Sequence, residues 1–265
     1  MQWIPTYYRL NGVMLLKDIA LFPVGISNSC LYASQYLKKS GMTLIDHISP
    51  EITHLLLDIP SFIEHGLLRD NRSLPELLPM LPETVTIIGG NLTPDYLLNY
   101  KKIDLLKDSS FLYQNAAITA ECTLQVAANA LNTTFSDSPA LVLGWGRIGK
   151  CLSRLLQAVG CRVTVAARKE DDRAMAMAMG LDVLGYSDIP DRLHHFRILI
   201  NTVPHQTIPI PILDAWKDGI KLDLASSPGM VCDNVITARG LPGKYAPEST
   251  GKLIAESVKR ILTEV

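Results

Sequence analysis

The stretch that decides the fold reads Ala140-Leu141-Val142-Leu143-Gly144-Trp145-Gly146-Arg147-Ile148-Gly149. Its four apolar residues predict a buried strand, and its Gly-x-Gly-x-x-Gly pattern leads directly into a helix-forming segment. In that setting Gly144 permits a tight turn, Gly146 lets a diphosphate approach the backbone, and Gly149 lets the helix pack on the strand. The N-terminus of the helix favours the negative charge. We therefore expect the whole turn to bind a dinucleotide, through Gly144, Trp145, Gly146, Arg147, Ile148 and Gly149.

The next expected strand ends in Val165-Ala166-Ala167-Arg168-Lys169. A site for NAD carries an acidic residue here, about 20 positions after the glycines, because a carboxylate binds the ribose 2′-hydroxyl. Arg168 and Lys169 stand in this region instead, and both offer charge-assisted hydrogen bonds to a 2′-phosphate. The sequence therefore favours NADP(H). The alternative is a basic pair that is merely exposed to solvent, since Glu170 and Asp171 follow at once.

Strands and helices alternate outward from this turn. A βαβαβ series of this kind predicts a doubly wound Rossmann sheet. The run over residues 113–131 contains neither Gly nor Pro and predicts a long helix that bridges two α/β units. We expect strands at residues 140–143, 162–166, near Val183, 197–201, 220–224 and 235–238, and helices at 147–159, 171–179, 189–195, 211–217 and 248–265.

The N-terminal half shows a similar alternation. Its expected strands, at residues 19–24, 42–45, 54–59 and 84–88, alternate with helices at 30–39 and 74–80, which indicates a mainly parallel sheet. We therefore predict an α/β chain of two domains, with an N-terminal flavodoxin-like or Rossmann-like parallel sheet and a C-terminal NAD(P)-binding Rossmann domain. The expected boundaries are 1–112 for the first domain, 113–131 for the bridging helix, 132–247 for the second domain, and 248–265 for a helix that returns to the first.

Composition limits the range of functions. The 265 residues exceed one typical domain of about 150 residues, and 48% of them are apolar. A formal net charge of −1 provides no basic excess for a nucleic acid or a membrane surface. No segment approaches the roughly 20 apolar residues of a membrane span, so we expect a cytoplasmic protein. The five cysteines form no C-x-x-C pair, and we expect no metal site.

Polar residues follow the fourth and fifth strands of the second domain, in Asn201-Thr202-Val203-Pro204-His205 and Asp223-Leu224-Ala225-Ser226-Ser227. Ligands bind at the carboxyl ends of strands in open α/β sheets. For His205 we expect a proton acceptor or a donor to a carboxylate, with a surface histidine as the alternative. Asp223 is either a functional group or the residue that fixes its own loop. We expect the coenzyme to contact Asn201, Thr202, Val203, Pro204, Asp223, Ala225 and Ser226.

These loops together resemble those of the family formed by the A subunit of dipicolinate synthase. The resemblance covers about residues 110 to 265 and also includes Gly240-Leu241-Pro242-Gly243, Ala246-Pro247 with Thr250-Gly251, and Asn115 with Thr119-Ala120-Glu121. It implies an NADP-dependent dehydrogenase of sporulation and dipicolinate biosynthesis, acting on a CH–CH group. Such an enzyme oxidises a dihydrodipicolinate-type ring to pyridine-2,6-dicarboxylate, and its partner is a flavoprotein B subunit.

The strand-end loops and the resemblance together indicate a set of site residues. We expect Glu121, His205 and Asp223 to be catalytic, and Asn115, Thr119, Ser227 and Lys244 to bind the dicarboxylate substrate, which needs mainly orientation and anchors for two carboxylates. The chain departs from the family at Val24-Gly25-Ile26-Ser27-Asn28-Ser29, where the family usually has a Gly-Gly-Asp-x-Arg-like loop, and at Ser227, where a basic residue is common. An arginine for a substrate carboxylate is therefore missing.

Two other functions stay open. One is an enzyme like the 2-hydroxyacid dehydrogenases, whose coenzyme domain has the same layout, although we find no clear Arg, Glu and His set. The other is a non-catalytic NADP-binding protein with a regulatory or assembly role. The sequence leaves open whether the chain forms a homo-oligomer.

Overall fold

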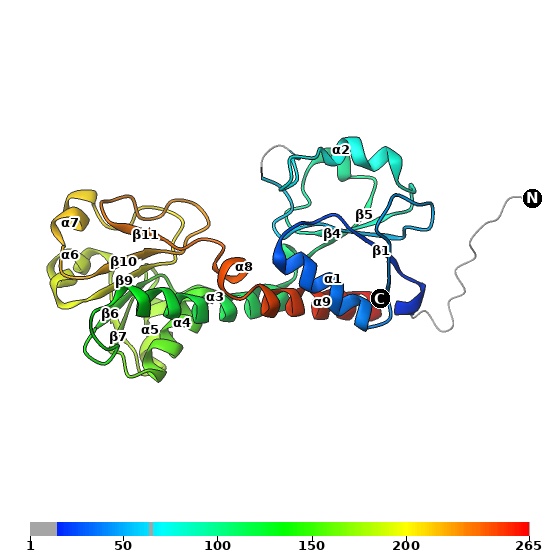
Figure 1. Ribbon diagram of the computed structural model, residues 1–265. Helices are drawn as coiled ribbons and strands as arrows, with labels where there is room; N and C mark the ends of the chain where they lie inside the picture. Colours follow the sequence, from blue (N-terminus) through cyan, green and yellow to red (C-terminus); the bar gives the residue numbers. More distant parts are fainter. Residues whose placement is uncertain (1–14, 64–65, 265) are drawn as a thin grey trace, which may run out of the picture. The chain divides into compact units, whose positions relative to one another are not determined.

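The computed structural model describes residues 15–63 and 66–264. These residues form two compact units. Unit 1 comprises the chain up to Asn115 together with Ala246–Val265, and unit 2 comprises Ala116–Tyr245. Figure 1 labels the helices and strands of both units.

Unit 1 is built on a five-stranded sheet whose order is β2-β1-β3-β4-β5 and whose pairs are all parallel. This is the flavodoxin-like order, in which chain direction across the sheet reverses next to the first strand. The edge strand β5 was not predicted, because two exposed lysines take the place of an apolar run. The strands are β1 (Ala20–Pro23), β2 (Thr43–Leu44), β3 (His54–Leu56), β4 (Thr86–Gly89) and β5 (Lys101–Asp104).

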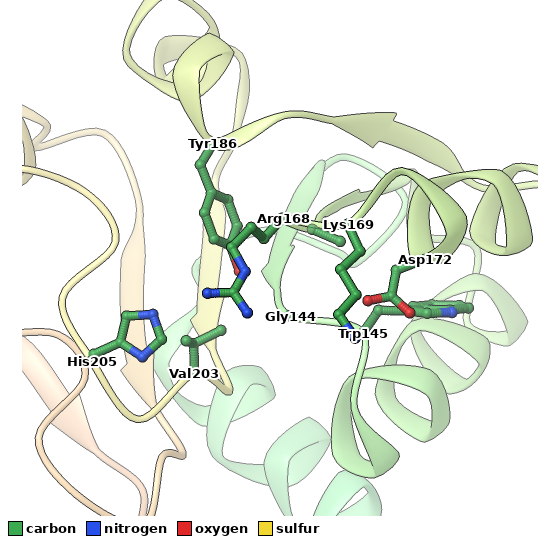
Figure 2. A pocket seen from close by; sticks show the side chains of 9 residues that line it. Gly144, Trp145, Arg168, Lys169, Asp172, Tyr186, Val203 and His205 are labelled. Atoms are coloured by element: carbon green, nitrogen blue, oxygen red, sulfur yellow. The ribbon is translucent and has the colours of Figure 1, made fainter.

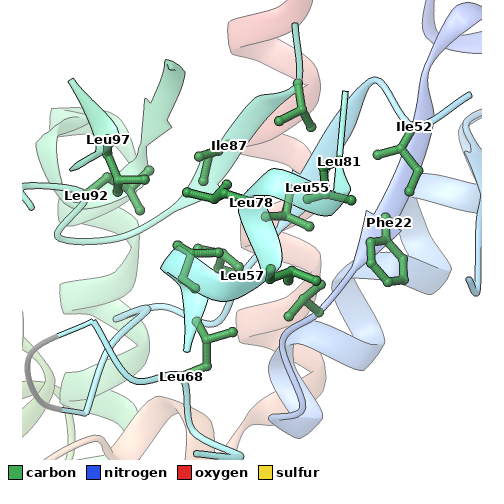
Figure 3. Packing of buried hydrophobic residues seen from close by; sticks show 14 residues of the cluster. Phe22, Ile52, Leu55, Leu57, Leu68, Leu78, Leu81, Ile87, Leu92 and Leu97 are labelled. Carbon is green, nitrogen blue, oxygen red and sulfur yellow. The ribbon is translucent and has the colours of Figure 1, made fainter. Parts of the chain in front are cut away.

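The core of unit 1 lies between this sheet and a short helical segment, as Figure 3 shows. That segment is α2 (Leu74–Leu77), which continues as the 3-10 turn η2 (Leu78–Met80), and together they match the helix predicted over residues 74–80. Leucines on alternate positions of β3 and its extension pack against it, because side chains alternate between the two faces of a strand. The other short turns are η1 (Leu16–Asp18), η3 (Asp95–Leu97) and η4 (Leu105–Lys107).

Three longer helices belong wholly or partly to unit 1: α1 (Asn28–Lys39), α3 (Ser109–Ala130) and α9 (Pro247–Thr263). Helix α3 begins four residues earlier than predicted. The Asp108 carboxylate accepts a hydrogen bond of 2.6 Å from the Phe111 N–H, so Asp108 satisfies a free donor of the first turn. Residue Val265, the predicted end of the last helix, lies outside the described residues.

Helix α9 packs along α1, although 208 or more residues separate them in the chain. Gly251 makes the close approach possible, because a Cβ there would lie 2.4 Å from the Tyr32 Cβ and 2.7 Å from the Ser29 carbonyl oxygen. Near the other end of α9, the Arg260 guanidinium donates to both carboxylate oxygens of Asp108 at 2.8 Å. The C-terminal helix is therefore an integral part of unit 1.

Unit 2 contains a six-stranded parallel sheet of order β11-β10-β9-β6-β7-β8. Counted within the unit, this is the Rossmann order, so the predicted fold class is confirmed. The strands are β6 (Ala140–Leu143), β7 (Val163–Ala166), β8 (Asp182–Leu184), β9 (Ile198–Asn201), β10 (Ile220–Asp223) and β11 (Val235–Thr237). The helices are α4 (Arg147–Ala158), α5 (Glu170–Ala178), α6 (Ile189–Arg192), α7 (Ile210–Ala215) and α8 (Leu241–Tyr245), with the turns η5 (Tyr186–Asp188) and η6 (Leu193–His195).

The strand order of unit 2 reverses between β6 and β9, which are neighbours in the sheet. Ligands of open α/β sheets bind at this switch point, outside the carboxyl ends of the strands. The glycine turn follows β6 and the loop from Thr202 follows β9, so the topology brings both to the same place. Within residues 15–63 and 66–264, we find no helix with the length and apolar character that crossing a membrane requires.

The contact at Gly251 yields a test of the α1–α9 packing. Replacing Gly251 with Ala adds a methyl group where three atoms of α1 lie within 3 Å. A helical Ala is favoured over Gly by about 1 kcal/mol, but overpacking costs about 1–3 kcal/mol, so we expect a net loss of stability. Calorimetry should show a lower Tm for unit 1, whereas Ser249→Ala, an exposed change on the same helix, should leave it in place. An unchanged or higher Tm for Gly251→Ala would contradict this packing.

Candidate functional site

The turn that follows β6 has the geometry that its three glycines require. Gly144 has a φ of 98°, in the left-handed region that side chains rarely adopt. A Cβ on Gly149 would lie 2.2 Å from the Gly144 carbonyl oxygen, so only glycine lets α4 start against the turn. At Gly146, by contrast, no atom lies within 4 Å of the position that a Cβ would take. The middle glycine thus faces open space, where a ligand can reach the backbone.

The first turn of α4 provides an anion site beside that space. Its N-cap residue is Gly146, which has no side chain to bond the free N–H groups, and the first turn carries no acidic residue. Exposed N–H donors and the positive end of the helix dipole favour a negatively charged group such as a diphosphate. The residues present therefore fit the dinucleotide that the fold implies.

A pocket of about 150 Å³ opens next to the glycine turn, and Figure 2 shows its side chains. Segments that follow the carboxyl ends of β6, β7, β8 and β9 meet here. Three of the lining residues, Ala167, Asp172 and Tyr186, were not predicted as site residues. The lining residues are Gly144, Trp145, Ala167, Arg168, Lys169, Asp172, Tyr186, Val203 and His205.

The charges in this pocket come from the loop between β7 and α5. Arg168 and Lys169 are both exposed, and Asp172 in the first turn of α5 is half-buried. The Arg173 guanidinium donates to the carbonyl oxygens of Ala167 at 2.8 Å and Arg168 at 2.9 Å, which holds the loop in place. In Figure 2 the Arg168 guanidinium lies beside the ring of Tyr186.

Tyr186 responds to these charges. Burial raises the pKa of its hydroxyl, the positive charge of Arg168 opposes the rise, and the negative charge of Asp172 adds to it. The phenol therefore stays neutral and can donate a hydrogen bond. The sequence carried little signal for this residue, because β8 is short and its end could not be located.

A buried hydrogen-bond network fixes the two loops after β9 and β10. The side-chain amide of Asn201 donates to the Val203 carbonyl and to the Asp223 carboxylate, both at 2.8 Å. Asp223 is buried and accepts four further bonds, from Arg239 and from the N–H groups of Ala225, Gly229 and Met230. Its carboxylate therefore accepts five hydrogen bonds that hold the loop.

Other contacts join these loops to each other and to the glycine turn. The Thr202 hydroxyl donates to the Leu143 carbonyl at 2.7 Å, next to Gly144. The Ser227 hydroxyl donates to the Pro204 carbonyl at 3.1 Å, and Ser226 beside it is exposed. The coenzyme-binding residues predicted after β6, β9 and β10 therefore lie at one edge of the sheet.

The site residues predicted on α3, which are Asn115, Thr119 and Glu121, do not all lie on one face of that helix. Thr119 is buried and Glu121 is exposed, and two positions correspond to a rotation of about 200° around a helix. Asn115 shares the face of Thr119, since they are four residues apart, and is half-buried. Asn115 is assigned to unit 1, whereas Thr119 and Glu121 are assigned to unit 2. Lys244 is exposed on α8.

Unit 1 has its own polar cluster at the loop after β1, which contains no arginine. Asp58, buried after β3, accepts a hydrogen bond of 3.0 Å from the Ser27 N–H and another from the Ser27 hydroxyl. Arg69 lies 3.8 Å from the Asp58 carboxylate, and Arg72 donates to the Val24 carbonyl at 3.1 Å. Two half-exposed arginines from another segment thus stand beside this loop.

The part of the chain that the structure describes holds no group of three His, Cys, Asp or Glu side chains that could bind a metal. All five cysteines are free thiols. Burial raises the pKa of Cys30 to about 12 and that of Cys161 to about 11, so both stay protonated and unreactive.

Comparison with known proteins identifies relatives of the whole architecture. No family model matches the chain. The A subunit of dipicolinate synthase from Bacillus subtilis is 29% identical over 174 residues, which span 62% of this chain and 59% of that relative's length. The chain therefore matches less than two thirds of this relative.

Solved structures agree on the fold. The A subunit of dipicolinate synthase from Bacillus halodurans has a TM-score of 0.82 at 23% identity. The superposition covers 95% of this chain and 100% of that structure. The transhydrogenase of Sinorhizobium meliloti has a TM-score of 0.69 at 11% identity, covering 94% of this chain and 87% of that one. The chain is thus homologous to the A subunit of dipicolinate synthase and has the same two-sheet, Rossmann-like α/β fold.

Proposed function

We propose that the chain is an NADP-dependent oxidoreductase that, like its relative, serves in forming dipicolinate. The observation that carries the proposal is the glycine turn at the switch point of unit 2, with open space at Gly146 and an uncapped helix beside it. In this proposal the diphosphate of the coenzyme binds the first turn of α4. Further support comes from the homology with the A subunit of dipicolinate synthase.

The pocket next to the turn supports NADP(H) over NAD(H). Within the described residues, the side chains of Arg168 and Lys169 make no hydrogen bond or ion pair, so both cations are available to a 2′-phosphate. Asp172 in the same pocket would instead suit the ribose hydroxyls of NAD. Two cations against one carboxylate leave the pocket positive, and the guanidinium can bind a phosphate with two parallel bonds.

The bound nicotinamide would supply the hydride acceptor. The chain itself would orient a ring dicarboxylate, through the proposed substrate residues Asn115, Thr119, Ser227 and Lys244. For Asp223 we propose a positioning role rather than proton transfer, because its buried carboxylate already accepts five hydrogen bonds. As the proton acceptor we propose Glu121, which is exposed. We further propose that the partner is a flavoprotein.

A direct assay tests the reaction. The purified chain is given NADP⁺ and the freshly formed condensation product of pyruvate and aspartate semialdehyde, with and without a flavoprotein partner. We expect dipicolinate, followed by its absorbance, and NADPH to form in equal molar amounts. If the coenzyme binds but no pyridine forms in either mixture, the substrate is wrong and a non-catalytic role is supported. Turnover of simple 2-oxo acids with NADPH would support the 2-hydroxyacid dehydrogenase alternative.

Arg168 allows the coenzyme assignment to be tested separately. Replacing Arg168 with Ala removes a charge-assisted donor pair, which is worth about 1.5–3 kcal/mol, so NADP⁺ should bind roughly 10- to 100-fold more weakly. The affinity for NAD⁺ should change less than about threefold, because no 2′-phosphate is involved. Calorimetric titration measures both affinities, and Arg154→Ala, an exposed cation on α4, controls for net charge. Equal losses for both coenzymes, or tighter NAD⁺ binding by the unmodified protein, would refute the assignment.

Asp223 gives a stability prediction that separates positioning from catalysis. Replacing Asp223 with Ala leaves five donors without an acceptor, one of them charged, and should cost about 3–5 kcal/mol. Calorimetry should show a lower Tm for unit 2 and no shift for unit 1, while Ser226→Ala, an exposed change in the same loop, should have little effect. A variant that keeps its Tm and its coenzyme affinity but loses turnover would show that Asp223 acts in the chemistry itself.

A further inference from the structure

His205 stands in a place that its expected role as proton acceptor does not explain. It lines the same pocket as Arg168 and Lys169, and that pocket includes none of the proposed substrate residues. A proton acceptor must come within hydrogen-bond reach of the reacting ring. A 2′-phosphate and a nicotinamide occupy opposite ends of the coenzyme, so if Arg168 binds the 2′-phosphate, a histidine in the same pocket is at the wrong end for this role.

We propose that His205 belongs to the adenosine end of the coenzyme site, where its imidazolium is a third cation for the 2′-phosphate and makes NADP(H) binding depend on pH. This inference rests on the proposed function, because it takes the glycine turn and Arg168 as the coenzyme site. It changes the role of His205 from chemistry to recognition. It also predicts that the protein takes up a proton when NADP(H) binds.

The backbone around His205 is held from both sides. Before it, the Ser227 hydroxyl donates to the Pro204 carbonyl. After it, the Gln206 side chain donates to the Ile208 carbonyl at 2.7 Å and accepts from the Val231 N–H at 2.8 Å. The imidazole itself is exposed, and among the described residues it has no hydrogen bond or ion pair. The backbone at His205 is thus fixed while its imidazole is available to bind a ligand.

The glycine turn sets the direction in which this loop runs. A Cβ on Gly144 would lie 2.6 Å from the Thr202 Oγ1 and 2.8 Å from a methyl carbon of Val203, so the first residues of the loop contact the turn. Two residues beyond Val203, the chain reaches His205. Figure 2 shows the imidazole of His205 and the side chain of Val203 along one side of the pocket, with Arg168 and Tyr186 near them.

The groups that face His205 decide how its charge responds to a ligand. They are Arg168 and Lys169 from the loop after β7, Asp172 from α5 and Tyr186 from η5. Without coenzyme, Arg168 and Lys169 outweigh Asp172 and leave the pocket with a net positive charge. A bound 2′-phosphate adds nearly two negative charges and reverses this balance. A bound 2′-phosphate therefore favours the charged imidazolium over the neutral imidazole.

The test compares His205→Gln with the unmodified protein, using three probes: NADP⁺, NAD⁺ and adenosine 2′-monophosphate. The last probe has the 2′-phosphate but no nicotinamide. At about pH 6, the variant should bind NADP⁺ and adenosine 2′-monophosphate roughly tenfold more weakly, and at about pH 8.5 the difference should fall below about twofold. NAD⁺ affinity should stay the same at both values. The 2′-phosphate of the free ligand titrates alike in both experiments, so the comparison cancels that contribution.

Proton uptake gives an independent readout. Calorimetric titrations with NADP⁺ near pH 7, in buffers of different ionisation enthalpy, should show proton uptake by the unmodified protein and less by His205→Gln. His195→Gln is the matched control, because His195 is an exposed histidine of the same unit that does not line this pocket. It should behave like the unmodified protein in every titration.

Each other outcome overturns the inference in a recognisable way. Unchanged affinity for NADP⁺ and adenosine 2′-monophosphate together with lost turnover would return His205 to proton transfer. Equal weakening of NADP⁺ and NAD⁺ at both pH values would show a contact with the adenine or a structural effect instead of phosphate recognition. Failure of the unmodified protein to bind any of the three probes would overturn the coenzyme site, and with it both this inference and the proposed function.

Discussion

The close approach of α4 to the end of β6 is the constraint on which the proposed coenzyme site depends. Because Gly149 has no side chain, the helix starts directly against the Gly144 carbonyl, and its free N–H groups end at the edge of the sheet. The parallel strand order then brings the loop after β9 to the same edge. An uncapped helix, an open glycine and the switch point of the sheet coincide, and together they make a place for a diphosphate.

The loops beside that turn are held in place by hydrogen bonds to buried side chains of the protein itself. Asp223 is buried at the end of β10, where an unpaired carboxylate would be costly, and its five hydrogen bonds remove that cost while fixing the backbone of residues 223–230. Asn201 couples this loop to the one after β9, so the two walls form one rigid assembly. Preorganised loops need no ordering when a ligand binds, and rigid walls of this kind suit recognition more than induced closure.

Much of this arrangement could be predicted from local patterns, since the glycine turn, the strands β6, β7, β9 and β10 and the cations at 168 and 169 all have strong sequence signals. The strand β5 could not be predicted in this way, because an edge strand with two exposed lysines has no apolar run. The hydrogen-bond partners of Asp223 could not be predicted from local patterns either. Asn201 and Arg239 lie 22 and 16 residues away, and they meet Asp223 only because β9 and β10 are neighbours. The position of His205 in the same pocket as Arg168 depends in the same way on the three-dimensional course of a loop.

The two units raise different questions about function. Unit 2 contains the groups that we propose for coenzyme recognition, whereas the proposed dicarboxylate substrate needs cations elsewhere, because Ser227 is neutral and already bonded to Pro204. The loop after β1 in unit 1 has no arginine, yet Arg69 and Arg72 stand beside it from a separate segment. Arg69 is only loosely paired, at 3.8 Å from Asp58, and 45% of its side chain is exposed. A missing arginine in one loop therefore does not leave this edge of unit 1 without positive charge, and a substrate carboxylate can be recognised by residues that a motif comparison would not select.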